Sequence, residues 1–239
     1  MRTALTAIAS LAALAGANAY AQTSSAAPAA ASAAPAAPRM MPAPLPLALT
    51  SLPAKGGAKL SVTSPAYKDG GQIPLANSGW GDNKFPGLSW KGAPKGTKSF
   101  AVIMQDSDPP AQYASILTIL HWTMFNVPAS VTSLAADSKA PPAGAVDGAN
   151  MRGTSAFYAG PHPPVGGPPH HYHLQVFALD TTLALADGAK VADIIASMKD
   201  HVLASGELVG TYQGPATAPV SSAPAASSAA PASSAPKTP

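Results

Sequence analysis

The chain has 239 residues, enough for one domain of ordinary size, and much of its 46% hydrophobic content is alanine, which buries little surface. The formal charge of +3 comes from Arg2, Arg39 and Lys237, because the 11 basic and 11 acidic residues between Thr50 and Gly214 cancel. The balance argues against a nucleic-acid-binding protein, which needs a basic surface, and the absence of cysteine excludes disulfides and thiolate chemistry.

The first 21 residues have the pattern of a secretory signal peptide. Arg2 gives a positive start, residues 4–17 form a short apolar run, and Ala19-Tyr20-Ala21 fits a cleavage site before Gln22. An ordinary apolar N-terminal helix is the alternative. The run is shorter than the ~18 apolar residues of a membrane-spanning helix, and no later stretch reaches that length, so no transmembrane span is expected. We expect the mature protein in the periplasm or outside the cell.

Two segments are expected to be disordered. Residues 22–48 and 215–239 consist largely of alanine, proline and serine. Proline removes backbone donors and alanine buries little area, so neither segment can offset the entropy lost on ordering. One folded domain is therefore predicted from residue 49 to residue 214.

Within that domain, apolar runs separated by glycine and proline clusters predict β-strands. The runs lie at residues 59–67, 99–106, 117–128, 171–180 and 207–213. The strands do not alternate regularly with helices, which disfavours a doubly wound parallel sheet. The fold class expected from this pattern is mainly β, a sandwich-like domain with a few peripheral helices.

One helix is predicted after residue 190. Five apolar side chains fall on a single helical face, namely Val191, Ile194, Ile195, Met198 and Val202. Gly206 suits the position that ends a helix. The helix is therefore expected to continue to the region of Val202–Gly206.

Asp106 and Asp108 close the strand predicted at residues 99–106. If the strand continued, its two-residue period would place both carboxylates on one side, where they could bind a cation or act as acid and base. An Asp-Pro turn is the alternative, since aspartate is common in turns. His121 lies inside an apolar strand, a position at which histidine is usually a structural core residue.

Histidines also gather at the start of the strand predicted at residues 171–180. His170 and Tyr172 share one face of that strand, and His171 and His173 share the other. The second pair could chelate zinc or copper, but it makes only half of a tetrahedral site, with no cysteine or glutamate near it in the sequence. We predict no metal site and no cofactor.

Three motifs, in chain order, resemble the phosphatidylethanolamine-binding protein family in its bacterial, Raf-kinase-inhibitor-like type. Asp106-Ser107-Asp108-Pro109-Pro110 is similar to the family's aspartate-rich turn, and His121-Trp122 with Asn126-Val127-Pro128 is similar to its His-Trp strand. Gly160-Pro161-His162-Pro163-Pro164, followed by His170-His171-Tyr172, is similar to its third motif. The resemblance covers roughly residues 60–213.

The chain departs from the family pattern at three places. Ser107 stands where the family turn has a proline, and His171 stands where an arginine often follows the motif histidine. The segment of residues 111–120 is long and apolar for the family. We expect these departures to affect the identity of the ligand more than the fold.

The resemblance implies a large antiparallel sheet packed on a smaller one, and a pocket for small anions such as phosphate, acetate or a phosphoethanolamine headgroup. It places the proline-rich loop at the wall of the pocket and leaves His171 and His173 on the far face. The positions that match the family's pocket are Asp106, Asp108, His121, Gly160, Pro163, His170 and Tyr172.

The function expected from this resemblance is that of an exported, non-catalytic protein that binds a small phosphate-bearing or carboxylate ligand. One alternative is a regulatory or inhibitory protein that binds a protein partner through the rim of the pocket. Another is an acid–base phosphoesterase that uses His121, His170 and Asp106, although the sequence shows no activated nucleophile beside them. A homodimer is possible for this type.

Overall fold

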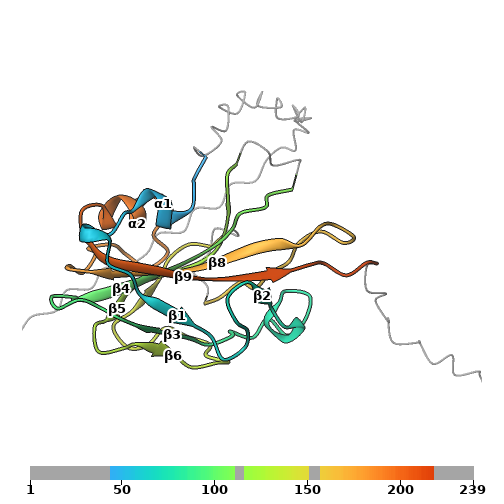
Figure 1. The fold of residues 1–239 in the computed structure, drawn as a ribbon, viewed down its shortest axis with the longest axis horizontal. Helices are drawn as coiled ribbons and strands as arrows, with labels where there is room; N and C mark the ends of the chain where they lie inside the picture. The colour runs from blue at the N-terminus through green and yellow to red at the C-terminus, as the bar shows by residue number, and fades with distance from the viewer. Residues whose placement is uncertain (1–43, 111–115, 151–156, 218–239) are drawn as a thin grey trace, which may run out of the picture. The chain divides into compact units, whose positions relative to one another are not determined.

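The structure is a computed structural model that describes residues 44–110, 116–150 and 157–217 (Figure 1). The chain divides into two units at residue 41, and all described residues belong to the second. The predicted signal peptide, residues 22–43 and residues 218–239 lie outside the described part. Among the described residues, no helix is long and apolar enough to cross a membrane.

Two β-sheets form the domain, as the sequence predicts. The larger has the strand order β2-β9-β8-β4-β5-β7, and its pairs are antiparallel except for β2 with β9. Its strands are β2 (Gly71–Gln72), β4 (Ser99–Asp106), β5 (Ile119–Pro128), β7 (Val146–Asp147), β8 (His170–Leu179) and β9 (Val202–Tyr212). The smaller, antiparallel sheet has the order β1-β3-β6, formed by β1 (Ser61–Thr63), β3 (Leu88–Lys91) and β6 (Ser133–Leu134).

The large sheet is covered on both faces, which explains why its central strands read as apolar runs. One face packs on the small sheet through aromatic side chains such as Trp90, Phe100 and Trp122. The other face packs under two helices, α1 (Ala48–Ser51) and α2 (Val191–Met198), around Ile103, Phe177 and other buried residues. Figure 1 shows the helices and the small sheet on opposite sides of β8 and β9.

The predicted strands at residues 99–106, 117–128 and 171–180 are confirmed to within two residues as β4, β5 and β8. The strand predicted at 59–67 is reduced to β1, since Pro65 follows shortly. The short one-turn helices η1 (Lys55–Gly57) and η2 (Leu75–Asn77), and strands β2, β3, β6 and β7, were not predicted.

The predicted helix end is wrong. The helix α2 ends at Met198, and Asp200 adopts a left-handed conformation with φ of 63°, which reverses the chain. Val202 begins β9 instead of continuing the helix, and Gly206 lies inside that strand. Gly206 is a glycine for another reason: a Cβ there would collide with the backbone carbonyl of Leu60.

The domain also begins before the predicted boundary at residue 49. Ala48 is fully buried, and its amide donates a hydrogen bond to Oε1 of Gln105 at 2.8 Å. The amide of Leu49 donates to Oε1 of Gln175 at 2.6 Å. The part of the predicted disordered segment from residue 44 to residue 48 is therefore packed on the large sheet. Gly214, at the other predicted boundary, is buried, and Pro215 accepts a hydrogen bond from Gly166.

Candidate functional site

Three adjacent strands bring Asp106, His121 and His170 together at one end of the large sheet. Asp106 is the last residue of β4, which lies between β5, the strand of His121, and β8, which begins at His170. Oδ2 of Asp106 lies 2.7 Å from Nδ1 of His170 and 4.0 Å from Nε2 of His121. All three side chains are at most 4% exposed. We call these residues, with Tyr172, the Asp106 cluster.

Hydrogen-bond partners fix the proton on one nitrogen of each imidazole ring. Nδ1 of His121 lies 3.0 Å from the carbonyl oxygen of Ala159, which only accepts, so Nδ1 carries a hydrogen. Burial lowers the pKa of His121, and the nearby Asp106 carboxylate only partly opposes this effect. His121 is therefore neutral near pH 7, with a bare Nε2 turned toward Asp106. His170 likewise donates from Nδ1 to Asp106, which leaves its Nε2 available.

Tyr172 supplies a further polar group beside the two histidines. Its ring packs edge-to-face on His121, with centroids 5.1 Å apart, and stacks with His170 at 6.3 Å. The hydroxyl is buried and has no hydrogen-bond partner of good geometry within the described residues, although the Asp106 carboxylate lies near enough to interact with it. Burial, and then the charge of Asp106, raises the pKa of Tyr172 far above its usual value, so the phenol stays protonated. Its O–H therefore has no well-placed acceptor among the described residues, and it lies beside the two bare ring nitrogens.

Gly160 and Pro163 belong to the loop that holds His121. The amide of Gly160 donates to Oδ1 of Asn83 at 2.7 Å, and a Cβ on Gly160 would collide with the carbonyl oxygen of Asn77. The carbonyl of Pro163 accepts from Nε1 of Trp80 at 3.0 Å. Glycine is therefore required by close packing, and both predicted residues act through their backbone.

The loop of residues 75–84 supports this wall of the site, and sequence reasoning missed it. Asn77 accepts a hydrogen bond from the Tyr158 hydroxyl at 2.7 Å, and the ring of Trp80 stacks on His162 at 4.1 Å. The signal in the sequence is the stretch from Asn77 to Asn83, where a tryptophan stands between glycines in a polar loop.

Asp108 does not join the cluster, so the idea of two carboxylates on one side is wrong. The strand ends at Asp106, and the amide of Asp108 donates to Oδ1 of Asp106 at 2.8 Å, which is the turn that the alternative predicted. Oδ2 of Asp108 instead accepts from the amide of His171 at 2.7 Å and lies 2.9 Å from Nδ1 of that residue. Burial alone would raise the pKa of Asp108, but the hydrogen bonds from His171 outweigh this and lower it.

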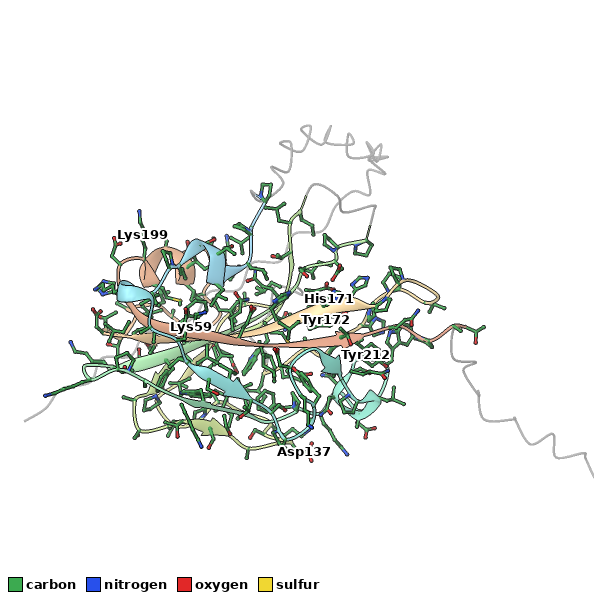
Figure 2. All side chains as sticks on the ribbon, in the orientation of Figure 1. Lys59, Asp137, His171, Tyr172, Lys199 and Tyr212 are labelled. Carbon is green, nitrogen blue, oxygen red and sulfur yellow. The ribbon has the colours of Figure 1, made fainter. Side chains whose placement is uncertain are left out.

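The second histidine pair lies away from the cluster, as the alternation along β8 predicts. His171 is exposed while Tyr172, its neighbour in Figure 2, is buried. Nδ1 of His173 lies 2.8 Å from Oε2 of Glu207, a carboxylate too distant in sequence to be anticipated. Across residues 44–110, 116–150 and 157–217, no group of three or more histidines and carboxylates is placed to hold a metal ion.

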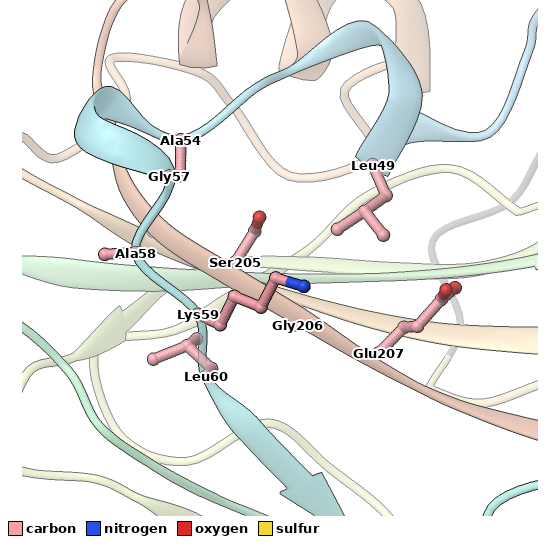
Figure 3. Close-up of a pocket in the computed structure, with 9 residues that line it drawn as sticks. All are labelled: Leu49, Ala54, Gly57, Ala58, Lys59, Leu60, Ser205, Gly206 and Glu207. Carbon is pink, nitrogen blue, oxygen red and sulfur yellow. The ribbon is translucent and has the colours of Figure 1, made fainter.

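A separate pocket of about 410 Å³ lies between the N-terminal segment and β9 (Figure 3). Its walls include Leu49, Lys59, Leu60 and Glu207. None of the seven predicted site residues lines it, so the pocket is not the predicted site.

Comparisons with known proteins point to a single family. Residues 63–213 match the family model described as phosphatidylethanolamine-binding protein. A UPF0098 protein of Methanothermobacter thermautotrophicus is 38% identical over 157 residues, which cover 64% of this chain and 99% of that protein. The UPF0098 protein YbcL of Escherichia coli is 36% identical over 178 residues, which cover 70% of this chain and 94% of that protein.

Two crystal structures share the fold. That of YbcL from Escherichia coli, described as a new member of the mammalian PEBP family, has a TM-score of 0.59 at 35% identity and covers 65% of this chain and 99% of YbcL. That of a phosphatidylethanolamine-binding protein homologue from Chlamydia trachomatis has a TM-score of 0.60 at 31% identity and covers 65% of this chain and 98% of that chain.

Proposed function

Because the chain belongs to the phosphatidylethanolamine-binding protein family, we propose that it is an exported, non-catalytic protein that binds a small anion at the Asp106 cluster. The anion is a phosphate, the phosphate of a phosphoethanolamine headgroup, or a carboxylate. The export part of the proposal rests on the signal-peptide pattern of the first 21 residues and places the protein in the periplasm or outside the cell.

The buried hydroxyl of Tyr172 is the observation that carries the proposal. A buried donor without a partner costs about 1–3 kcal/mol, so native structures retain few of them without a reason. The Nε2 atoms of His121 and His170 complete a set of three groups with unused hydrogen-bonding capacity. An anion oxygen could accept from the hydroxyl and from any ring nitrogen that carries a hydrogen.

Binding of an anion should be coupled to uptake of a proton. In their neutral forms both histidines present a bare Nε2, which accepts hydrogen bonds and repels an anion, and Asp106 adds a negative charge. A histidine that gains a proton at Nε2 becomes a donor to the anion and neutralises part of that charge. Affinity is therefore expected to fall as pH rises.

Isothermal titration with inorganic phosphate and with O-phosphoethanolamine from pH 5 to 8.5 tests this proposal. We expect weaker binding at higher pH and a net proton uptake, which appears as a dependence of the measured heat on the ionisation enthalpy of the buffer. Equal affinities for the two ligands would mean that the phosphate alone is recognised. Binding that does not vary over this range, or no binding of either ligand at any pH, would reject the proposal.

Two histidine variants locate the site. His170→Gln removes the ring that Asp106 holds, and we expect it to abolish phosphate binding. His171→Gln is the matched control, since the same residue type is changed one position along β8 on the opposite, exposed face. Equal losses in both variants would exclude the Asp106 cluster as the binding site.

A further inference from the structure

A second polar arrangement lies on the other face of the large sheet and includes Ser107. Oγ of Ser107 lies 3.2 Å from Nε2 of His173, and Nδ1 of the same ring lies 2.8 Å from Oε2 of Glu207. The three residues come from the end of β4, from β8 and from β9, which are neighbours in the sheet. The side chain of His173 is 14% exposed, so the ring is held in place yet remains reachable.

The order of these contacts is that of a nucleophile, a base and an orienting carboxylate. Glu207 accepts the hydrogen on Nδ1, which leaves the lone pair of Nε2 directed at the serine hydroxyl. A hydroxyl that is hydrogen-bonded to such a nitrogen is activated as a nucleophile, whatever the fold that supports it. Oδ2 of Asp108, at 3.3 Å, is the other acceptor within reach of the Ser107 hydroxyl.

The arrangement depends on Ser107, a residue at which this chain departs from the motif that it resembles. Ser107 stands at the turn position where the motif that it resembles has a proline, which has neither a hydroxyl nor an amide hydrogen. His173 was considered in the sequence only as half of a metal site, and the structure gives it a serine and a glutamate as partners instead. Neither residue contributes to the Asp106 cluster.

We propose that Ser107 is a reactive serine that takes an acyl group from small, activated carboxylic esters. Nε2 of His173 takes the hydroxyl proton as Oγ of Ser107 forms a bond to the ester carbonyl carbon. The bond from that carbon to the leaving oxygen then breaks, and the leaving group departs with the proton from His173. The products are an acyl ester on Ser107 and the free alcohol or phenol.

The local backbone makes this a site of modification and not an efficient hydrolase. The amide of Asp108 already donates to Asp106, the amide of Ser107 donates to the carbonyl of His171, and Pro109 and Pro110 have no amide hydrogen. None of these neighbouring amides is free to donate to the oxyanion that forms during acyl transfer. Stabilisation of that oxyanion is usually the largest single contribution to the rate. Without such donors, only esters with a good leaving group, such as a phenolate, react with Ser107 at a useful rate. Hydrolysis of the acyl-serine is slower because the serine alkoxide is a poorer leaving group, so the acyl-serine accumulates.

Incubation of the full chain with 4-nitrophenyl acetate, followed by mass spectrometry of its peptides, tests the assignment on the unaltered protein. We expect acetylation at Ser107 to be faster than at any other serine. Ser107→Ala and Ser107→Pro, which restores the motif residue, should both lose the fast release of nitrophenolate. His173→Gln should slow it by about a hundredfold or more, which is the lower end of general-base effects. Glu207→Gln should slow it less.

Two control variants match these changes. His201→Gln alters another histidine whose Nδ1 is paired with a carboxylate, that of Asp180, but whose Nε2 makes no hydrogen bond to a serine in the part of the chain that the structure describes. Ser138→Ala removes a half-buried serine whose hydroxyl donates to a backbone carbonyl. Both should react at Ser107 as the unaltered chain does. Acetylation spread evenly over several serines, or a rate at Ser107 that His173→Gln leaves unchanged, would overturn the proposal.

Discussion

His121 connects the stability of the domain to pH. Burial lowers its pKa in the folded chain, so between the folded value and the unfolded value of about 6.5 the unfolded chain binds more protons. The free energy of unfolding must then fall as pH drops below about 6.5, and it recovers as pH rises above that value. A single proton of this kind contributes at most about 1.4 kcal/mol per pH unit.

Urea unfolding at pH 7.5, 6.5 and 5.5 measures this effect. We expect His121→Gln to lose less stability than the unaltered chain between pH 7.5 and 5.5, although it is less stable at pH 7.5 because the hydrogen bond to Ala159 is altered. The histidines outside the Asp106 cluster contribute equally to both proteins, so the difference between the two slopes reports on His121 together with its coupling to His170. Parallel slopes would contradict the assignment of a neutral, buried imidazole.

Tyr172 should show a conflict between stability and binding. Its hydroxyl is buried without a hydrogen-bond partner in the described residues, so Tyr172→Phe removes a desolvation penalty and should leave the free energy of unfolding equal or up to about 1 kcal/mol higher. The same change removes a donor from the proposed anion site, and phosphate affinity should fall by about tenfold or more, as for one hydrogen bond to a charged group.

Tyr67→Phe is the matched control for that variant. The hydroxyl of Tyr67 is also buried without a partner among the described residues, and the charge near it is that of Asp69 and not that of Asp106. Chemical denaturation should again show equal or higher stability, but phosphate titration should give the affinity of the unaltered chain. If the two phenylalanine variants bind phosphate equally well, the Tyr172 hydroxyl is not part of the binding site.

At the scale of elements, the sequence predicts strands well where burial dictates their composition. The strands β4, β5 and β8 are apolar runs because both faces of the sheet are covered, and their two-residue period correctly separated Tyr172 from His171. The end of α2 was missed because Val202 fits a helical spacing by coincidence. No local sequence pattern predicts the left-handed backbone conformation of Asp200 or the close approach of the Leu60 backbone to Gly206.

The candidate site was predicted from the family resemblance and not from local patterns, which indicated a turn at Asp106 and a core position for His121. The structure places Asp106, His121 and His170 together at one end of the large sheet. The supporting contacts of Asn77 and Asn83 join residues about 80 positions apart, as in the hydrogen bond from Gly160 to Asn83, and such pairs leave no local signal. Asp108 was included through the same resemblance, and the turn that the local sequence also indicated takes its side chain out of the cluster.

A substitution at Gly206 tests whether this residue lies inside strand β9, as the structure shows, and not at the end of a helix. In the middle of that strand a Cβ would collide with the backbone of Leu60, where the chain crosses the edge of the sheet. Because the obstacle is backbone, Gly206→Ala should lower the free energy of unfolding by more than about 2 kcal/mol, in the range of other steric defects.

Gly167→Ala is the control for that variant. This glycine lies in the loop before β8, has no positive φ, and would place a Cβ 3.3 Å from the carbonyl of Pro164. Urea unfolding should show a change of less than about 1 kcal/mol, as for most substitutions away from the core. If both alanine variants lose the same free energy of unfolding, the backbone at Leu60 can move away to accommodate the added Cβ at residue 206.

At the scale of the whole domain, two glutamines attach the N-terminal segment of residues 44–52 to the large sheet. Gln105 and Gln175 are fully buried on β4 and β8, and between them they bond the amides of Ala48 and Leu49 and the carbonyl of Pro46. Thr118, which precedes β5, donates to the carbonyl of Leu45 at 2.8 Å. The segment therefore acts as part of the core, because it satisfies polar groups that the sheet would otherwise bury unpaired.

A chain that begins at Pro44 should be as stable as the full chain, whereas one that begins at Pro53 should lose about 2–4 kcal/mol. The shorter chain loses the buried side chains of Ala48 and Leu52, and the burial of Leu52 alone contributes about 1.5–3 kcal/mol. It also loses the backbone groups that form hydrogen bonds with both glutamines. Urea unfolding of the two truncated chains measures the difference directly.

Since Thr118 and Gln105 lie on either side of the β4–β5 connection that follows Asp106, phosphate titration of the shorter chain should also show weaker binding at the Asp106 cluster. Equal stability of the two chains would mean that the segment only rests on the sheet. Lower stability with unchanged phosphate affinity would mean that it supports the core without supporting the cluster.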